Sequence, residues 1–173
     1  MIFIFKKKGF TLVELLVSIA ILAVIVSLGT YSVLKSDPGD LLGLEAKRFG
    51  DKIQWAQVLA FSQKEVEDKV PEAYGVFLIA KDKYMIYADF NDNCSYDSTV
   101  DQAVETIQLE KKVKFSADDL NKGLCFKTAD ILNNICLDNQ CPAVNNQTYT
   151  LIHDNGRKND INFNISTGNV LIK

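Results

Sequence analysis

The chain has 173 residues, of which 47% are hydrophobic and 24% charged, and its formal net charge at pH 7 is −3. This length accommodates one globular domain of ordinary size beside an apolar N-terminal segment. Pro and Gly are sparse, which argues against a disordered chain or a low-complexity stalk, and the acidic balance argues against nucleic acid as a partner.

The N-terminal segment combines three lysines, Lys6 to Lys8, with an apolar run from Phe10 to Leu28. As a helix rising about 1.5 Å per residue, this run spans about 28 Å, close to the roughly 30 Å hydrocarbon core of a bilayer. Basic residues beside a membrane span stay in the cytoplasm. We therefore expect a single crossing with the N-terminus inside and everything after Leu34 outside.

Glu14 is the one charged residue inside this apolar run. A charge at the middle of a bilayer costs roughly 2.5 to 3.5 kcal/mol on insertion scales, so this carboxylate calls for a partner of opposite charge. No small-residue cleavage motif follows the run, as it would in an ordinary secretory signal. A plain signal anchor is the alternative interpretation.

The sequence KKKGFTLVELLVSIAILAVIVSL resembles the N-terminus of type IV pilins and of the pseudopilins of type II secretion systems. The resemblance implies that a prepilin peptidase cuts between Gly9 and Phe10 and methylates the new N-terminus at Phe10. It also implies that Glu14 pairs with the N-terminus of a neighbouring subunit and sets the register of assembly. Residues 1–9 would be the leader peptide and residues 10–34 the transmembrane helix.

Residues 35–66 predict a kink followed by an amphipathic helix. Pro38 disfavours helix at Asp37, so we expect a break near Ser36 to Asp40. From Leu41 to about Lys64, apolar residues recur at spacings of three and four, which predicts a helix with one face on a sheet. This stripe comprises Leu42, Ala46, Phe49, Ile53, Ala56 and Ala60, widened by Trp55, Val58, Leu59 and Phe61.

Residues 67–173 predict a β-rich globular domain. The sequence YGVFLIAKDKYMIYADF predicts a β-hairpin with its turn at Lys81 to Lys83. Further strands are expected at 105–109, 112–115, 124–127, 135–137, 149–153, 160–165 and 170–172. The expected fold is α+β and pilin-like: a long N-terminal helix, membrane-spanning in its first half, packed on an antiparallel sheet or small β-sandwich.

This order of elements extends the resemblance. The KIQWAQVLAFSQ helix, the hairpin ending in YADFNDNCSYD and the final TLIHDNGRKNDINFNISTGNVLIK together resemble the H-type minor pseudopilins and the related FimT-like minor pilins. The match lies in the pattern of elements more than in a motif.

All four cysteines lie in the part of the chain expected outside the cytoplasm, where disulfides persist. Four cysteines allow three connectivities. Cys136 and Cys141 are close enough to close the short loop ICLDNQC, and this pairing leaves Cys94 with Cys125. Zinc binding by the four thiolates is the alternative, but no C-x2-C spacing is present and His153 is the only histidine.

The segment DFNDNCSYD alternates oxygen-bearing side chains in the manner of a calcium-binding loop. These are Asp89, Asn91, Asn93, Ser95 and Asp97. Cys94 stands where an EF-hand has glycine, and Val100 stands where it has a bidentate glutamate. A looser calcium site closed by Asp101 or Glu105 is one hypothesis, and a polar turn rich in Asx residues is the favoured alternative.

No nucleotide-binding loop, HExxH helix or hydrolase elbow occurs, and His153 has no nucleophile near it in the sequence, so we expect no enzymatic activity. The expected function is that of a structural subunit, a minor pilin or pseudopilin without a cofactor. Its expected partners are prepilin peptidase, other pilin subunits and the membrane. It would reside in the cytoplasmic membrane and then in a periplasmic or cell-surface filament. The alternative is a single-span anchored module that binds an exported ligand.

Overall fold

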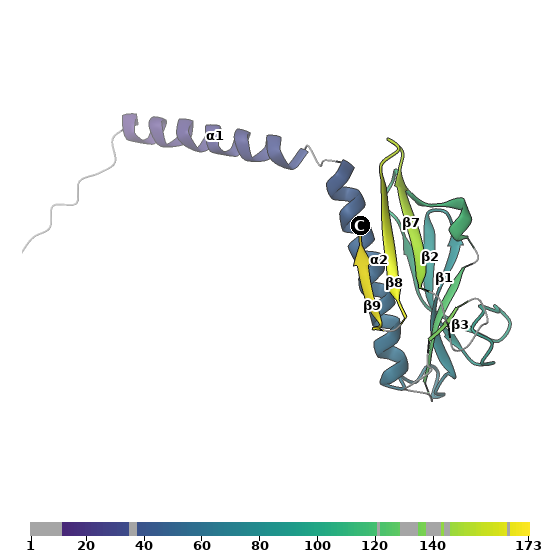
Figure 1. The fold of residues 1–173 in the computed structure, drawn as a ribbon. Coiled ribbons are helices and arrows are strands. Elements are labelled where there is room, and N and C mark those ends of the chain that lie inside the picture. Colours follow the sequence, from purple (N-terminus) through teal and green to yellow (C-terminus); the bar gives the residue numbers. More distant parts are fainter. Residues whose placement is uncertain are drawn as a thin grey trace, which may run out of the picture. The chain divides into compact units, whose positions relative to one another are not determined.

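A computed structural model of the chain describes residues 12–34, 38–120, 122–128, 135–137, 143, 146–165 and 167–173, with 25–34 and 38–40 described by their backbone alone. The chain forms two compact units, Met1–Asp37 and Pro38–Lys173. The first unit contains one helix, and the second contains a helix and two antiparallel sheets (Figure 1).

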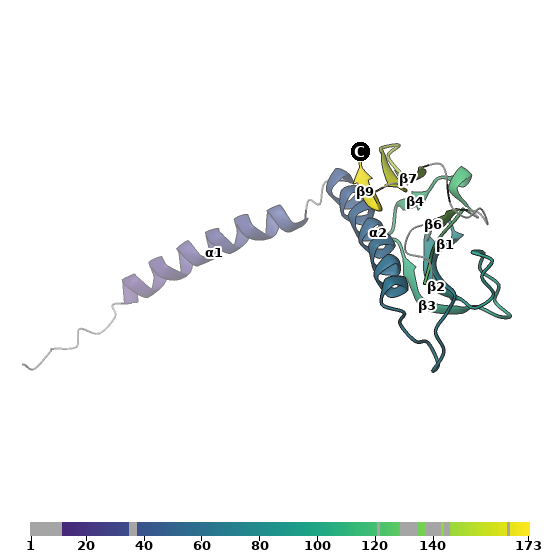
Figure 2. The same cartoon turned by 60° about the horizontal axis from the view of Figure 1, so that its bottom comes forward.

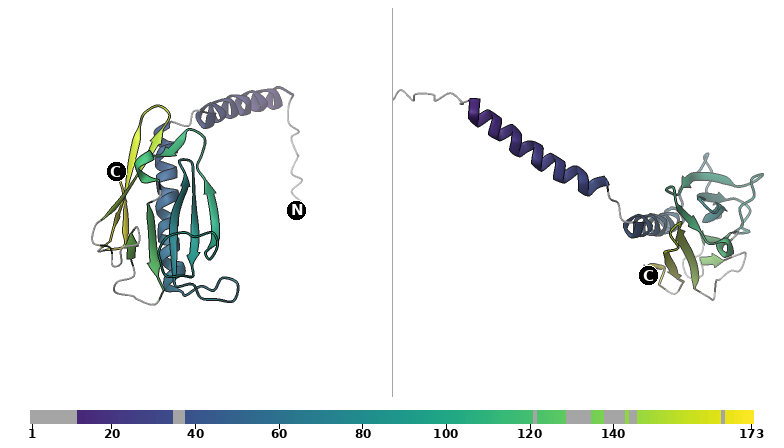
Figure 3. Two further views of the ribbon diagram at one scale, coloured as in Figure 1. Left: turned by 90° about the vertical axis from the view of Figure 1, so that its right-hand side faces the viewer. Right: turned by 90° about the horizontal axis from the view of Figure 1, so that it is seen from above.

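Helix α1 runs from Leu12 to Leu34 without a break (Figure 3). Leu, Val, Ile and Ala supply most of its residues, and no proline interrupts its backbone hydrogen bonds. Across the described residues, no helix is long and apolar enough to qualify as a membrane span. The transmembrane assignment of residues 10–34 stays a prediction.

Helix α2 runs from Pro38 to Phe61. Of the break expected near Ser36 to Asp40, residues 35–37 lie outside the described residues, whereas residues 38–40 are helical. Proline fits the first turn of a helix, where its missing N–H is not needed. The C-terminus is a Schellman motif: the N–H of Lys64 bonds the carbonyl of Leu59 at 3.2 Å, around Gln63 with φ of 48°. The helix ends three residues before the predicted Lys64.

The buried face of α2 confirms the predicted periodicity. Each of its six members is at most 1% exposed, namely Leu42, Ala46, Phe49, Ile53, Ala56 and Ala60. Trp55 and Leu59 lie half-buried beside this face, whereas Val58 is 58% and Phe61 50% exposed. The predicted widening of the stripe is wrong for these last two, since a helix buries only the sector that faces its sheets.

The first sheet contains five strands in the order β3-β2-β1-β5-β6. Their bounds are β1 Ala73–Ala80, β2 Lys83–Asp89, β3 Gln102–Gln108, β5 Gly123–Lys127 and β6 Ile135–Leu137. Ala80 pairs with Lys83 across a two-residue turn, so the predicted hairpin is confirmed. In Figure 3 (left) strands of this sheet pass in front of α2.

The second sheet contains four strands in the order β4-β7-β8-β9. Their bounds are β4 Val113–Phe115, β7 Gln147–His153, β8 Lys158–Asn164 and β9 Asn169–Ile172, with a short 3-10 helix, η1, at Ala117–Asp119. Every strand expected from the sequence is present in one of the two sheets, with shifts of at most a few residues at its ends. The fold class is α+β with antiparallel sheets, as predicted.

The core lies between α2 and the two sheets. Helix α2 contacts β1 and β5 of the first sheet and β7, β8 and β9 of the second (Figure 2). The ring of Phe49 lies edge-on to Tyr84, Phe115 and Tyr149, with centroid distances of 4.9, 5.0 and 5.1 Å. This aromatic cluster joins the helix to both sheets, because Tyr84 belongs to β2 and the other two rings to β4 and β7.

Candidate functional site

Helix α1 presents an apolar surface on all sides. Between Leu12 and Val24, the exposed Leu, Val and Ile side chains have 53% to 75% of their surface accessible within the single chain. A helix that is apolar all round is stable only when lipid or other protein covers it. The described part of α1 is therefore a surface for burial against something outside this chain.

Glu14 lies in the first turn of α1. A negative charge in the first turn interacts favourably with the positive end of the helix dipole. The hydroxyl of Ser18 donates a 2.8 Å hydrogen bond to the backbone carbonyl of Glu14, so that serine satisfies its polar group within its own helix. Between residues 12 and 24, Glu14 is the one ionisable residue, and Ser18 is the one other polar residue. Gly9 and Phe10 lie outside the described residues.

Three cysteine sulfurs meet at one place in the globular domain. Cys94, in the loop between β2 and β3, forms a disulfide with Cys125 on β5. Cys136 on β6 lies directly opposite Cys125 in the strand pairing and is also disulfide-bonded. Its predicted partner, Cys141, lies outside the described residues. The structure therefore contains the Cys94–Cys125 pair proposed from the sequence.

These sulfurs form a small buried cluster with Ala73, apart from the main core. Because side chains alternate along a strand, Leu124 and Phe126 face the main core while Cys125 points to the other side of the first sheet. The Sγ atoms of Cys94, Cys125 and Cys136 all lie within 4.8 Å of one another.

The loop after β2 is a network of Asx turns. The buried carboxylate of Asp89 accepts backbone N–H bonds from Asn91, Asp92 and Cys94 at 2.9, 2.8 and 2.6 Å. Asn91 and Asn93 each accept an N–H bond from the residue two positions on. The oxygens considered as calcium ligands thus bind backbone donors, which favours the Asx-turn interpretation. The calcium hypothesis stays a prediction.

Two aspartates close the same loop. Asp101 accepts backbone N–H bonds from Phe90 and Asp97 at 3.1 and 2.7 Å. The backbone N–H and hydroxyl of Thr99 bond Asp97 and lower its pKa, whereas burial, the largest effect at Asp89, raises the pKa of Asp89. Among the described residues, Asp89, Asp97 and Asp101 do not form a carboxylate cluster close enough to hold a metal ion.

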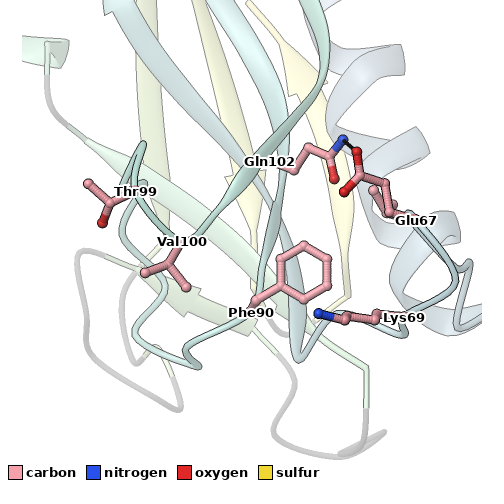
Figure 4. Close-up of a pocket in the computed structure, with 7 residues that line it drawn as sticks. Glu67, Lys69, Phe90, Thr99, Val100 and Gln102 are labelled. Atoms are coloured by element: carbon pink, nitrogen blue, oxygen red, sulfur yellow. Dashed lines mark hydrogen bonds between the residues drawn. The ribbon is translucent and has the colours of Figure 1, made fainter.

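A surface pocket of about 350 Å³ lies between the α2–β1 connection and the β2–β3 loop (Figure 4). Phe90 and Val100 supply apolar lining, and the amide of Gln102 donates to the carboxylate of Glu67 at 3.0 Å. In Figure 4 the side chain of Lys69 points its ammonium toward Phe90. The volume is near the lower end of small-molecule sites, which is about 300 Å³. No sequence motif indicates this pocket, because it joins residues 66–69 to residues 90–102.

His153 lies at the end of β7 and is 6% exposed. Its Nδ1 atom accepts a 3.1 Å hydrogen bond from the backbone N–H of Asn155 in the turn to β8. This contact gives the histidine a role in shaping the hairpin turn.

Sequence reasoning missed Glu45, a carboxylate on α2 that is 2% exposed. Arg48 approaches its Oε1 atom at 3.5 Å, and Oε2 has no hydrogen-bond partner among the described residues. Burial raises the pKa of Glu45, and Arg48 opposes this effect. The signal was present in the periodicity, since Glu45 follows Leu42 by three residues and precedes Phe49 by four, which places it on the apolar stripe.

Residues 4–30 match a family model described as the prokaryotic N-terminal methylation motif. This motif is a type IV pilin-like leader. It supports the resemblance of the N-terminal segment to pilins and pseudopilins. It indicates a pilin-like subunit that is processed by prepilin peptidase. The chain has no significant match to a curated protein or to a solved structure.

Proposed function

We propose that this protein is a minor pilin or pseudopilin, built into a type IV pilus or a secretion pseudopilus through its N-terminal helix. The observation that carries the proposal is α1 itself. Its apolar side chains are exposed all round, and most of the helix lies within the N-terminal methylation motif at residues 4–30. A surface of this kind is stable in a bilayer before assembly and against other such helices afterwards.

In this proposal the precursor sits in the cytoplasmic membrane with Lys6 to Lys8 inside and the unit Pro38–Lys173 outside. Prepilin peptidase cuts after Gly9 and methylates Phe10. The new N-terminus then lies one helical turn from Glu14, so the carboxylate of one subunit meets the N-terminal amine of the next. This ion pair offsets the free-energy cost of a charge in lipid only in the register that brings the two groups together. That register is therefore preferred.

The experiment compares Glu14→Ala with Ser18→Ala in cells that assemble the filament. We expect Glu14→Ala to lower incorporation into sheared filaments at least about tenfold, which corresponds to 1.4 kcal/mol. Ser18→Ala removes a polar group that bonds only within its own helix, so it should assemble normally. Mass spectrometry of both variants checks that each begins at a methylated Phe10. Normal incorporation of a processed Glu14→Ala protein would show that Glu14 does not set assembly.

A second candidate is a membrane-anchored module that binds an exported ligand, and the mixed polar and apolar pocket beside Phe90 favours it. The same measurements separate the two functions. A protein that keeps Met1 and stays monomeric in the membrane supports the anchored module, whereas a methylated Phe10 supports the filament subunit.

A further inference from the structure

The pocket beside Phe90 is lined by two segments that are separate in the sequence. Residues 66–69 of the α2–β1 connection form one wall, and residues 99–102, where the β2–β3 loop enters β3, form the other. The volume of about 350 Å³ suits a small ligand rather than a large cofactor. We propose that this pocket binds an apolar amino acid residue through its free α-carboxylate and its α-nitrogen.

The first wall is a tight turn. Val66 and Lys69 exchange backbone hydrogen bonds of 2.8 and 3.1 Å. The two residues between them, Glu67 and Asp68, have φ of 51° and 62°. Positive φ at both central positions is typical of a type I′ turn. This turn fixes the directions in which the side chains of Glu67 and Lys69 leave the backbone.

The second wall is held by hydrogen bonds to one buried carboxylate. Asp101 is 7% exposed and accepts the backbone N–H of Phe90 at 3.1 Å and that of Asp97 at 2.7 Å. The next residue, Gln102, begins β3 and pairs with Ala88 of β2. Because the fold holds both walls, a ligand would enter a preformed pocket and would order few protein groups on binding.

The pocket contains two charges that point in different directions. In Figure 4 Lys69 points its ammonium toward Phe90, whereas Glu67 points its carboxylate toward Gln102. The amide of Gln102 occupies one oxygen of Glu67 at 3.0 Å. Among the described residues, the ammonium of Lys69 has no ion-pair or hydrogen-bond partner. One cation and one carboxylate oxygen therefore remain available to a ligand.

These groups match the chemistry of an amino acid with a free carboxylate. The α-carboxylate can pair with the ammonium of Lys69, and the α-nitrogen can donate to the second oxygen of Glu67. An apolar side chain can pack on Phe90 and Val100, which supply apolar lining. A phosphate group is a poorer fit, because its two negative charges would meet a single cation and would be repelled by Glu67.

The same chemistry has two sources, a free amino acid and the carboxy-terminal residue of a polypeptide. The rim residues Glu67, Lys69 and Thr99 are exposed, so a preceding residue can continue into solvent. The inference applies equally to a filament subunit and to an anchored module, because it concerns the unit Pro38–Lys173. Its failure would leave the filament proposal standing, since that proposal depends on the N-terminal segment.

The experiment follows the backbone amide signals of the isotope-labelled full chain by NMR in detergent micelles. L-phenylalanine and the tripeptide Gly-Gly-Phe are the probes. We expect saturable shifts at residues 66–69 and 99–102, with a dissociation constant of about 1 mM or lower for the better probe. The carboxamide of each probe should bind at least about tenfold more weakly, because it lacks the charge that pairs with Lys69. The probe that binds more tightly identifies the source.

Lys69→Gln is the test variant, and Lys64→Gln, an exposed residue of the same connection outside the pocket, is its matched control. We expect Lys69→Gln to weaken binding of the better probe at least about tenfold and Lys64→Gln to leave it unchanged. Val100→Asp adds a carboxylate to the apolar lining and should abolish the saturable shifts. The midpoint of thermal unfolding checks that each variant is folded. Absence of saturable shifts, equal binding of the carboxamides, or unchanged binding by folded Lys69→Gln would each overturn the proposal.

Discussion

At the scale of single residues, the most informative side chain of the globular domain is Glu45. It lies on the buried face of α2 and forms an ion pair with the half-exposed guanidinium of Arg48. Burial raises the pKa of this carboxyl above its ordinary value, because it penalises the charged form more than Arg48 compensates. Its protonation is therefore linked to folding.

Glu45→Gln should remove a pH dependence of stability. Because the pKa of Glu45 is raised in the folded state above the ordinary 4.5, its contribution is fully present below that pH and is lost as the pH rises through the folded-state pKa. Urea unfolding from pH 4 to pH 8 should show this decline in the wild type and a flatter profile in Glu45→Gln. The exposed Glu65→Gln, beyond the C-terminal end of α2, is the control and should keep the wild-type profile. Identical slopes for Glu45→Gln and wild type would contradict the assignment.

At the scale of elements, the close approach of β1 and β2 depends on a glycine. Gly75 pairs with Tyr87 across these strands. A Cβ at Gly75 would lie 2.3 Å from a ring carbon of Tyr87, which is fully buried and cannot move into solvent. In contrast, a Cβ at Gly43 on α2 would meet nothing within 4 Å. The two glycines differ in their surroundings, although both lie inside regular elements.

Gly75→Ala should destabilise the domain by about 2 to 3 kcal/mol, the usual cost of forcing extra volume into a packed core. Gly43→Ala should instead stabilise it by up to about 1 kcal/mol, because alanine favours helix over glycine. The free energy of unfolding from urea titrations measures both. A Gly75→Ala protein as stable as wild type would show that the Tyr87 ring can yield, and a loss in Gly43→Ala would show an unseen contact at α2.

At the scale of the whole molecule, the two units differ in what stabilises them. The unit Pro38–Lys173 has its own core, with α2 covered by strands of both sheets. Helix α1 exposes its apolar side chains and contributes no member to that core in the part of the chain that the structure describes. The unit Pro38–Lys173 therefore builds its core from its own residues.

A chain shortened to residues 38–173 should fold alone, remain monomeric without detergent and unfold cooperatively. Its thermal midpoint should agree with that of the domain in the full-length protein within a few degrees, since a change of 1 kcal/mol moves the midpoint of a domain this size by about 2–8 °C. Circular dichroism and analytical ultracentrifugation check these expectations. A shortened chain without cooperative unfolding would mean that α1 is needed for the fold.

Local sequence patterns were sufficient for much of the fold. The spacing of Leu42, Ala46 and Phe49 predicted the buried face of α2, and alternation and turn residues located the strands, because both signals depend on neighbours in the chain. The start of α2 was misjudged at Pro38, where proline can either break a helix or begin it. Helix bounds of this kind depend on the packing that follows.

The N-terminal segment can be recognised without a fold, because the methylation motif, the apolar run and the position of Glu14 within it are properties of consecutive residues. Sites made by residues distant in the sequence became visible only once the chain was folded. The spacing of the cysteines left three connectivities open, whereas the fold places Cys125 opposite Cys136 and joins Cys125 to Cys94 of the β2–β3 loop. The same is true of the pocket beside Phe90. Such sites depend on which strands pair. Strand pairing is selected by the burial of the whole core and not by any local pattern.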